Sequence, residues 1–303
     1  MKPKSAAKAH ALLPVTPTEE EILRTMSTYR YMTALDVAYS LFSPKSLTHV
    51  RSILTRLAGG EDYKERQCLY RFPWPTGKAG NPERIFTLGA AGREIVQRLG
   101  MPVTWYYRPS KTGRLNSSYL AHQLLVTRFV ICACRFTSEQ PEYTLADVRL
   151  CYDLERSLRN RAGEAVVPDA WLHFARDNGR KFPVLVEIDR GTEDQERFKN
   201  HVGGRIEFIR SGDYARVFGT PAVLIAYATT GRIQGHADTR RKTMGAWTME
   251  VLRELAIESW ASIFRFTSAV VYTKLYEESN ALFTQPVWYR PDAPGTPAPL
   301  LGS

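Results

Sequence analysis

The strongest constraint on the fold of this chain is a hydrophobic strand that ends in two acids. Residues 183–189 read PVLVEID, an apolar run dense in branched side chains that closes with Glu187 and Asp189. Side chains alternate along a strand, so these two carboxylates share one face. Like charges at that separation raise each other's pKa and reduce stability. We therefore expect something nearby to neutralise them.

The segments around this strand alternate between strand-like and helix-like patterns. A long helix is expected from residue 117 or 118 to about Phe136. Further strands are predicted at 144–154, 165–174, 222–228 and 264–273, and further helices at 192–209 and 240–256. This alternation predicts an α/β domain, in which helices cover the faces of a mixed sheet. The sequence has no Gly-rich phosphate loop, serine nucleophile elbow or zinc-protease motif.

A third acid is expected beside the pair. Asp169 follows Pro168 in an adjacent predicted strand. Mg²⁺ prefers oxygen ligands and commonly binds one or two carboxylates together with a phosphate. Such an ion activates water and neutralises charge on a phosphodiester. One hypothesis is therefore that Asp169, Glu187 and Asp189 bind Mg²⁺ or Mn²⁺.

The alternative is a strand end held by ion pairs. Basic residues are plentiful nearby, and the acids would then pair with Arg190, Lys181 or Arg205. An opposite charge at close range relieves the repulsion without any metal ion. The spacing of the residues favours neither interpretation over the other.

The positive charge is concentrated in the first third of the chain. Residues 1–114 hold 18 lysines and arginines against 9 aspartates and glutamates, whereas residues 115–303 hold 23 against 22. Such asymmetry is typical of a polyanion-binding module joined to a second domain. Double-stranded DNA is the expected partner. A membrane surface is disfavoured, because the sequence shows no basic amphipathic helix with a broad apolar face.

Other sequence features lead us to expect a cytoplasmic protein. The longest apolar stretch, residues 124–134, contains Arg128 and is too short to cross a bilayer. The N-terminal residues lack the sustained apolar segment of a secretory signal. The spacing of the four cysteines is typical of neither a zinc site nor a disulfide framework, so we expect reduced core cysteines.

The N-terminal third has a recognisable order of elements. Residues 1–16 are expected to be a flexible basic arm. Helices are then predicted from about Thr18, at 33–41 and at 44–59, followed by strands at 67–72 and 84–88 and a helix at 90–99. This is the order of a winged helix-turn-helix, which we assign to residues 17–100. In that arrangement the third helix enters the major groove and the hairpin loop contacts the neighbouring backbone or minor groove.

The third predicted helix has the polar face that this role requires. Its leucines and Val50 fall at helical spacing and predict one buried stripe. The candidate DNA contacts are donors or cations on another face and in the hairpin loop: Lys45, Thr48, His49, Ser52, Arg56 and Lys78. Such side chains suit base edges and phosphates. The alternative is an ordinary solvated face on a domain used for dimerisation or protein contact, and the excess of positive charge favours DNA.

The rest of the chain completes the predicted domain organisation. Residues 101–118 break the periodicity and are assigned as a linker, whose aromatic residues 105–107 either pack on one domain or stack on bases. Residues 119–280 form the α/β domain. Residues 281–303, which are rich in proline, form a tail expected to be mobile.

Several motifs resemble known families. A PD dipeptide followed after 17 residues by E-x-D, on an αβββαβ topology, is similar to the PD-(D/E)xK nuclease superfamily. The segments LAHQLLV, VVPDAWLHF and VLVEIDRGTE, behind a winged helix, resemble the bacterial replication-relaxation protein family over roughly residues 17–275. Its most specific piece is EIDRGTE, residues 187–193. The resemblance implies a role in plasmid replication and plasmid DNA relaxation.

The chain departs from the nuclease pattern at one position. The superfamily's lysine is replaced here by Asp189. Some restriction endonucleases of this fold use a third acid at that place. In others the lysine moves to the following helix, where Lys199 is the candidate. The resemblance thus implies a catalytic set of Asp169, Glu187, Asp189 and Lys199, or a degenerate site that only binds.

Two functions are therefore carried forward. The first is a DNA-binding protein of plasmid or mobile-element replication, with metal-dependent DNA nicking by the C-terminal domain. The second is a non-catalytic transcription or replication regulator whose nuclease-like domain is an assembly platform. In either case a second copy of the chain, or a replication or transposition protein, is an expected partner.

Overall fold

The computed structural model describes residues 15–59, 67–73, 83–109, 116–154, 158–159, 166–230, 234–268, 276–277 and 279–302. Contacts divide the chain into two compact units, Met1–Thr127 and Arg128–Ser303. The division falls inside helix α6 (Ser117–Glu139), later in the chain than the predicted linker at 101–118.

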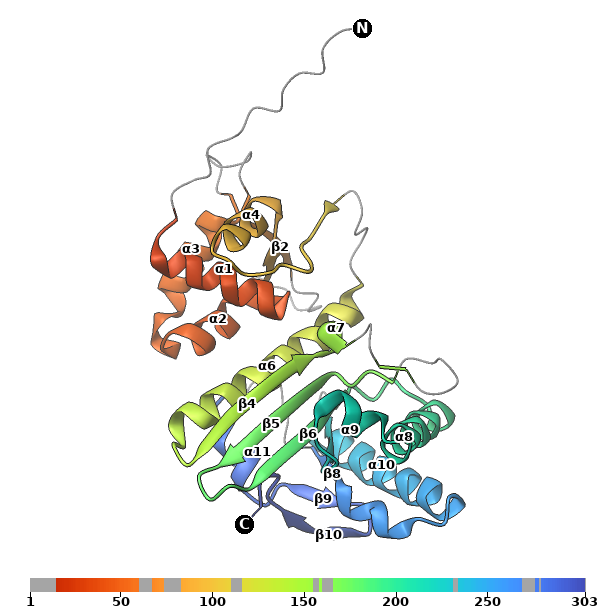
Figure 1. Cartoon of the computed structure of the whole chain (residues 1–303). Helices are drawn as coiled ribbons and strands as arrows, with labels where there is room; N and C mark the ends of the chain where they lie inside the picture. Colours follow the sequence, from red (N-terminus) through yellow and green to blue (C-terminus); the bar gives the residue numbers. More distant parts are fainter. Residues whose placement is uncertain are drawn as a thin grey trace, which may run out of the picture. The chain divides into compact units, whose positions relative to one another are not determined.

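The N-terminal unit contains three helices, a β-hairpin and a fourth helix, the order predicted from the sequence (Figure 1). Its elements are α1 (Pro17–Tyr29), β1 (Met32–Thr33), α2 (Ala34–Leu41), the 3₁₀ helix η1 (Pro44–Ser46), α3 (Leu47–Leu57), β2 (Leu69–Pro73), β3 (Arg84–Leu88) and α4 (Ala90–Arg98). The strands form a small antiparallel sheet in the order β1-β3-β2.

Capping boxes begin the first two helices. The Thr33 side chain accepts from the backbone N–H of Asp36, and Asp36 accepts in return from the backbone N–H of Thr33. Helix α1 is capped in the same way by Thr16 with Glu19, two residues before the predicted Thr18, because Pro17 occupies the first helical position. Local sequence therefore determines where both helices start.

The predicted linker begins as a packed segment of the N-terminal unit. The backbone N–H of Tyr107 donates to the carbonyl oxygen of Leu88 at 2.8 Å. The Tyr107 ring lies 4.9 Å from both the Tyr70 and Phe72 rings, and Trp105 lies 5.3 Å from Tyr31. The aromatic cluster therefore packs on this unit, which was the first of its two predicted roles.

The C-terminal unit is an α/β structure built on one seven-stranded mixed sheet. The strands lie in the order β10-β9-β8-β7-β6-β5-β4. They comprise β4 (Tyr143–Leu150), β5 (Ala170–Arg176), β6 (Lys181–Asp189), β7 (Leu224–Thr229), β8 (Phe264–Thr267), β9 (Trp288–Arg290) and β10 (Ala293–Ala298). Strands β6, β7 and β8 are parallel, and the other neighbours are antiparallel.

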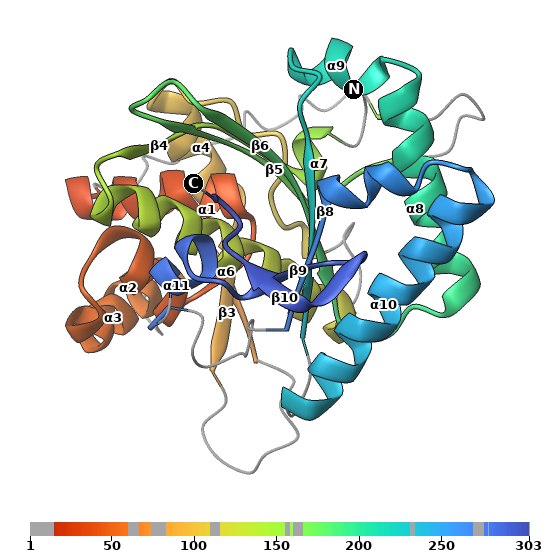
Figure 2. The same ribbon diagram turned by 90° about the horizontal axis from the view of Figure 1, so that it is seen from below.

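Helices cover both faces of this sheet (Figure 2). The helices α8 (Gln195–Arg210), α9 (Asp213–Phe218) and α10 (Gln234–Glu254) lie on one face, and α6 and α11 (Ser279–Thr284) on the other. Two short helices, α7 (Cys151–Leu154) and the 3₁₀ helix η3 (Glu258–Ile263), complete the unit. The predicted strand at 144–154 therefore ends at Leu150, and the chain turns into α7.

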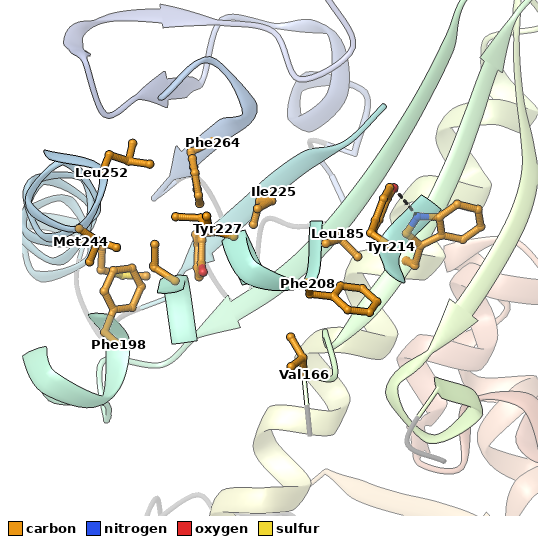
Figure 3. Packing of buried hydrophobic residues seen from close by; sticks show 14 of the residues in the cluster. Val166, Leu185, Phe198, Phe208, Tyr214, Ile225, Tyr227, Met244, Leu252 and Phe264 are labelled. Carbon is orange, nitrogen blue, oxygen red and sulfur yellow. Dashed lines mark hydrogen bonds between the residues drawn. The ribbon is translucent and has the colours of Figure 1, made fainter. Parts of the chain in front are cut away.

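Strand β6 lies inside the sheet, between β7 and β5, and is buried on both faces, which explains its apolar composition. Leu185 belongs to the cluster under α8 and α10, with Phe198, Tyr227 and Phe264 (Figure 3). Val184, Val186 and Ile188 are buried as well and alternate with it along the strand. In the same cluster, the Trp171 ring N–H donates to the hydroxyl of Tyr214 on α9 at 3.2 Å (Figure 3).

The prediction of a separate tail at 281–303 is wrong. Residues in this range form most of α11 and the two strands that complete the sheet, and Trp288, Leu300 and Leu301 are buried. The prolines are accommodated because β10 is an edge strand with an irregular register, where a missing N–H breaks few ladder bonds. In the described residues, moreover, we find no helix with the length and apolarity to cross a membrane.

Candidate functional site

The register of β5 and β6 brings Asp169 to the acidic end of β6. Ala170 pairs with Val186 across the two antiparallel strands. Asp169, one residue before Ala170, therefore lies beside Glu187, one residue after Val186. The backbone N–H of Asp169 donates to the Val186 carbonyl at 3.1 Å. In return, Asp169 Oδ2 accepts from the backbone N–H of Ile188 at 2.7 Å. One carboxylate oxygen of Asp169 is therefore engaged in holding the strand end.

Glu187 forms a buried ion pair with Arg205 of α8. Its Oε1 accepts from Arg205 Nε at 2.8 Å and from Nη2 at 2.5 Å. The Nη2 group also donates to the carbonyl oxygen of Val167 at 2.8 Å. Only 17% of the Glu187 side chain and 8% of the Arg205 side chain are exposed. Burial raises the pKa of Glu187 to about 7, against the lowering effect of Arg205, and the charge of Asp169 raises it further.

Asp189 forms a second ion pair, with Arg240 of α10. Arg240 Nε donates to Oδ2 and Nη2 donates to Oδ1, both at 3.0 Å, so the two planar groups meet as a fork. The Arg240 guanidinium also lies over the Trp247 ring, 5.1 Å from its centre. Asp189 Oδ2 accepts once more from the backbone N–H of Gly191 at 3.1 Å.

A histidine joins the same edge through Glu193, the last residue of the EIDRGTE segment. His201 Nδ1 lies 2.7 Å from Glu193 Oε1. This hydrogen bond raises the pKa of His201, and the nearby Glu187 charge acts in the same direction. Glu187, Asp189 and Glu193, at and just after the end of β6, are thus each paired with a basic group from α8 or α10.

Lys199 is not paired with any of these three acids. Its Nζ lies 2.7 Å from Glu250 Oε2 and 3.6 Å from Glu254 Oε1, both on α10. Six helical positions separate Lys199 from Arg205, which puts the two side chains on different flanks of α8. The structure does not bring Lys199 together with the three acids, and the cation nearest to Glu187 is Arg205.

The two acids at the end of β6 are paired with arginines. Among the described residues, no group of three or more His, Cys, Asp or Glu side chains is arranged to hold a metal. Glu187 and Asp189 each have an arginine in the position where a cation would relieve their charge. Ion pairs of the kind expected in the second interpretation are present: Arg205 is one of the three partners considered from sequence, and Arg240 is a further partner. Binding of Mg²⁺ or Mn²⁺ stays a prediction.

In the N-terminal unit, the candidate DNA contacts lie on η1 and α3. Those at Lys45, Thr48, His49, Ser52 and Arg56 are exposed, whereas Val50, Ile53, Leu54 and Leu57 of the same helix are buried. Arg56 Nη2 lies 2.8 Å from Glu19 Oε1 of α1. The remaining candidate, Lys78, lies outside the described residues.

Arg51 is the candidate that sequence reasoning missed. It is exposed on α3, three residues after Thr48 and next to Ser52. Helical spacing places Arg51 beside Thr48 and Ser52, at the border of the polar face predicted for this helix.

The fold and this edge together define a class: a mixed-sheet α/β protein in which the inner strand β6 ends in arginine-paired acids, preceded by a small helical unit with a hairpin. Comparison with family models then identifies the family. The replication-relaxation model matches residues 23–224, so the chain belongs to the replication-relaxation family. Comparison with curated proteins and with solved structures gave no significant match.

The matched region contains Asp169, Glu187, Asp189 and Arg205. It ends at Leu224, the first residue of β7, so Arg240 and the rest of the sheet lie beyond it.

Proposed function

We propose that the protein acts in plasmid or mobile-element replication as a double-stranded DNA-binding protein, and that its N-terminal unit is a winged helix-turn-helix that places α3 in the major groove. The observation that carries the proposal is the exposed face of η1 and α3, on which Lys45, Thr48, His49, Arg51 and Ser52 gather. Membership of the replication-relaxation family supports the biological role.

The packing of α3 supports its use as a recognition helix. Val50, Ile53 and Leu54 are buried on one side, and the donors occupy the other side over its whole length. A helix held in this way presents its polar face without losing its core contacts. Serine and threonine hydroxyls, histidine and arginine are the side chains that contact base edges and phosphates.

Arg56 has a different role in this proposal. Its guanidinium bonds to Glu19, which is buried and also serves the capping box of α1. Arg56 therefore ties the end of α3 to the start of α1, and Arg51 takes its place as the arginine that meets DNA.

For the C-terminal unit we favour the assembly-platform alternative, within a PD-(D/E)xK-like fold. Glu187 forms a buried ion pair with Arg205, and Asp189 forms a forked ion pair with Arg240. These two arginines already neutralise the acids. Metal-dependent nicking by Asp169, Glu187, Asp189 and Lys199 stays a prediction from sequence, and we assign no step to a metal ion. A homodimer or a replication or transposition partner likewise stays a prediction.

The proposed DNA contact is tested by fluorescence anisotropy with labelled duplex DNA at several salt concentrations. Each lost phosphate contact lowers the salt slope by about 0.9. Arg51→Ala should weaken binding and reduce the slope by about one contact, and Ser52→Ala should change the preference among duplex sequences.

Arg98→Ala provides the matched control, because Arg98 is an exposed arginine of the same unit that lies on α4. Equal losses from Arg51→Ala and Arg98→Ala would show that net charge, and not the α3 face, governs binding. Unchanged binding in Arg51→Ala would overturn the placement of α3.

A further inference from the structure

The C-terminal unit contains a hollow beside α10 that the proposed DNA contact does not use. Its volume is about 540 Å³, and it lies between one side of α10 and the strands β9 and β10, which run beside each other in both views (Figures 1 and 2). Pockets of this size hold ligands as large as a nucleotide. The hollow lies wholly beyond residue 224, where the family match ends.

Small residues on α10 make the room. Gly245 and Ala246 lie in the middle of the lining face, with Lys242 one turn before and Met249 one turn after. Across from them are Pro294 and Gly295 of β10. A Cβ atom at Gly245 would already contact Pro291 at 3.8 Å, so a side chain larger than that of alanine there would extend into the lining of the hollow.

Positive charge dominates the lining. Four of the lining residues are cations, Arg241, Lys242, Arg253 and Arg290, and one is an acid, Glu250. The acid is already bonded to Lys199 at 2.7 Å, and Arg290 is paired in a fork with Asp292. In the part of the chain that the structure describes, Arg241, Lys242 and Arg253 form no ion pair within 4 Å, although the Arg253 charge helps to lower the pKa of Glu250. The lining therefore carries an excess of positive charge.

The strongest indication of a ligand is the buried side chain of Arg241. Only 5% of it is exposed, and its Nε has no hydrogen-bond partner among the described residues. Its guanidinium lies over the Tyr289 ring at 3.7 Å, a contact that stabilises the positive charge but gives Nε no acceptor. Buried polar groups are nearly always hydrogen-bonded, and a buried charge without a partner is costly. An anion in the hollow would remove that cost.

We propose that this hollow binds the phosphate group of a nucleotide or of a nucleic-acid strand, with Arg241, Lys242 and Arg253 as its ligands. Guanidinium groups match phosphate oxygens in planar, paired hydrogen bonds, and an ammonium adds a point charge. The apolar lining by Met249, Phe266 and Tyr289 suits the sugar or base attached to that phosphate.

The test uses the full-length protein and three probes: inorganic pyrophosphate, dATP and a short single-stranded DNA. Binding is followed by the melting temperature and by titration calorimetry. Lys242→Ala with Arg253→Ala should weaken binding at least tenfold, because each removes a charge-assisted hydrogen bond. Both residues are exposed, so the double variant should fold normally. Arg210→Ala, an exposed arginine on α8, should bind like wild type.

The probes also identify the source of the phosphate. Binding of dATP without binding of the strand supports a nucleotide site, and preference for the strand supports a track for nucleic acid. Arg51→Ala should leave binding of dATP and pyrophosphate unchanged, so failure of the α3 proposal would be visible separately. The inference is overturned if wild type binds none of the probes, or if the double variant binds as well as Arg210→Ala.

Discussion

Arg205 donates through both Nε and Nη2 to a single oxygen of Glu187, and the same Nη2 reaches the carbonyl oxygen of Val167. The arginine therefore joins α8 to β6 and to the segment before β5 at one point. A cation held at the acidic strand end by three hydrogen bonds does the work that a divalent ion would otherwise do for Glu187. In the proposed assembly platform, this contact takes the place of a metal ion at Glu187.

Removing the arginine should be costly. Arg205→Ala leaves Glu187 buried without its partner, and we expect the free energy of unfolding to fall by about 3–5 kcal/mol. Replacing both partners together, as Glu187→Leu with Arg205→Met, should lower the free energy of unfolding far less, because neither charge of this pair then remains buried. Urea denaturation of the three proteins measures the difference. A loss below about 1 kcal/mol in Arg205→Ala would mean that the pair is not buried as described.

The raised pKa of Glu187 predicts a pH dependence of stability. Its folded pKa of about 7 lies above the ordinary value of 4.5, so the folded state holds the proton more tightly than the unfolded state. Stability should therefore fall as pH rises from about 4.5 to about 7, and then level off. Melting temperatures of wild type and Glu187→Gln across this range provide the measurement, and the variant should lose much of the slope.

His201 acts in the same direction and needs its own control. The hydrogen bond to Glu193 raises its pKa, so its contribution is present at low pH and lost as pH rises through the folded value. His201→Gln should therefore remove the upper part of the slope, while Glu187→Gln removes the lower part. Identical profiles for wild type and both variants would contradict the assignment.

Divalent metal should have little effect on the folded protein. Because arginines already neutralise Glu187 and Asp189, millimolar Mn²⁺ should leave the melting temperature of wild type unchanged. Supercoiled plasmid incubated with wild type, Asp169→Asn or Glu187→Gln in Mn²⁺ should show the same low background of nicking. A rise in melting temperature together with nicking that Glu187→Gln abolishes would restore the metal hypothesis.

Arg51 and Arg56 should differ in what they support. Arg56→Ala removes the partner of buried Glu19, and we expect a stability loss of about 0.2–1 kcal/mol because the arginine is itself half exposed. Arg51→Ala should leave stability unchanged and weaken duplex DNA binding. Denaturation curves and anisotropy titrations on the same preparations separate the two roles. Equal effects of both variants on both properties would contradict the division.

Much of the fold follows from local sequence. The Thr33 cap with Asp36, the buried stripe of α3 around Val50 and Leu54, and the apolar strand at 183–189 all lie where periodicity and capping place them. The C-terminal strands β9 and β10 were missed because prolines at 294 and 297 normally argue against a strand. Only a free sheet edge accepts them, and whether an edge is available is a property of the whole sheet.

The candidate site divides in the same way. The sequence alone determined that Glu187 and Asp189 share a face and that they need a neutralising partner, because alternation along a strand is local geometry. It did not determine which partner. Arg205 comes from the next helix, and Arg240 of α10 lies 51 residues after Asp189. Lys199, closer in sequence, bonds to Glu250 instead. The packing of α8 and α10 on the sheet decided this, because a buried acid pairs with the basic residue whose helix the tertiary structure places over it.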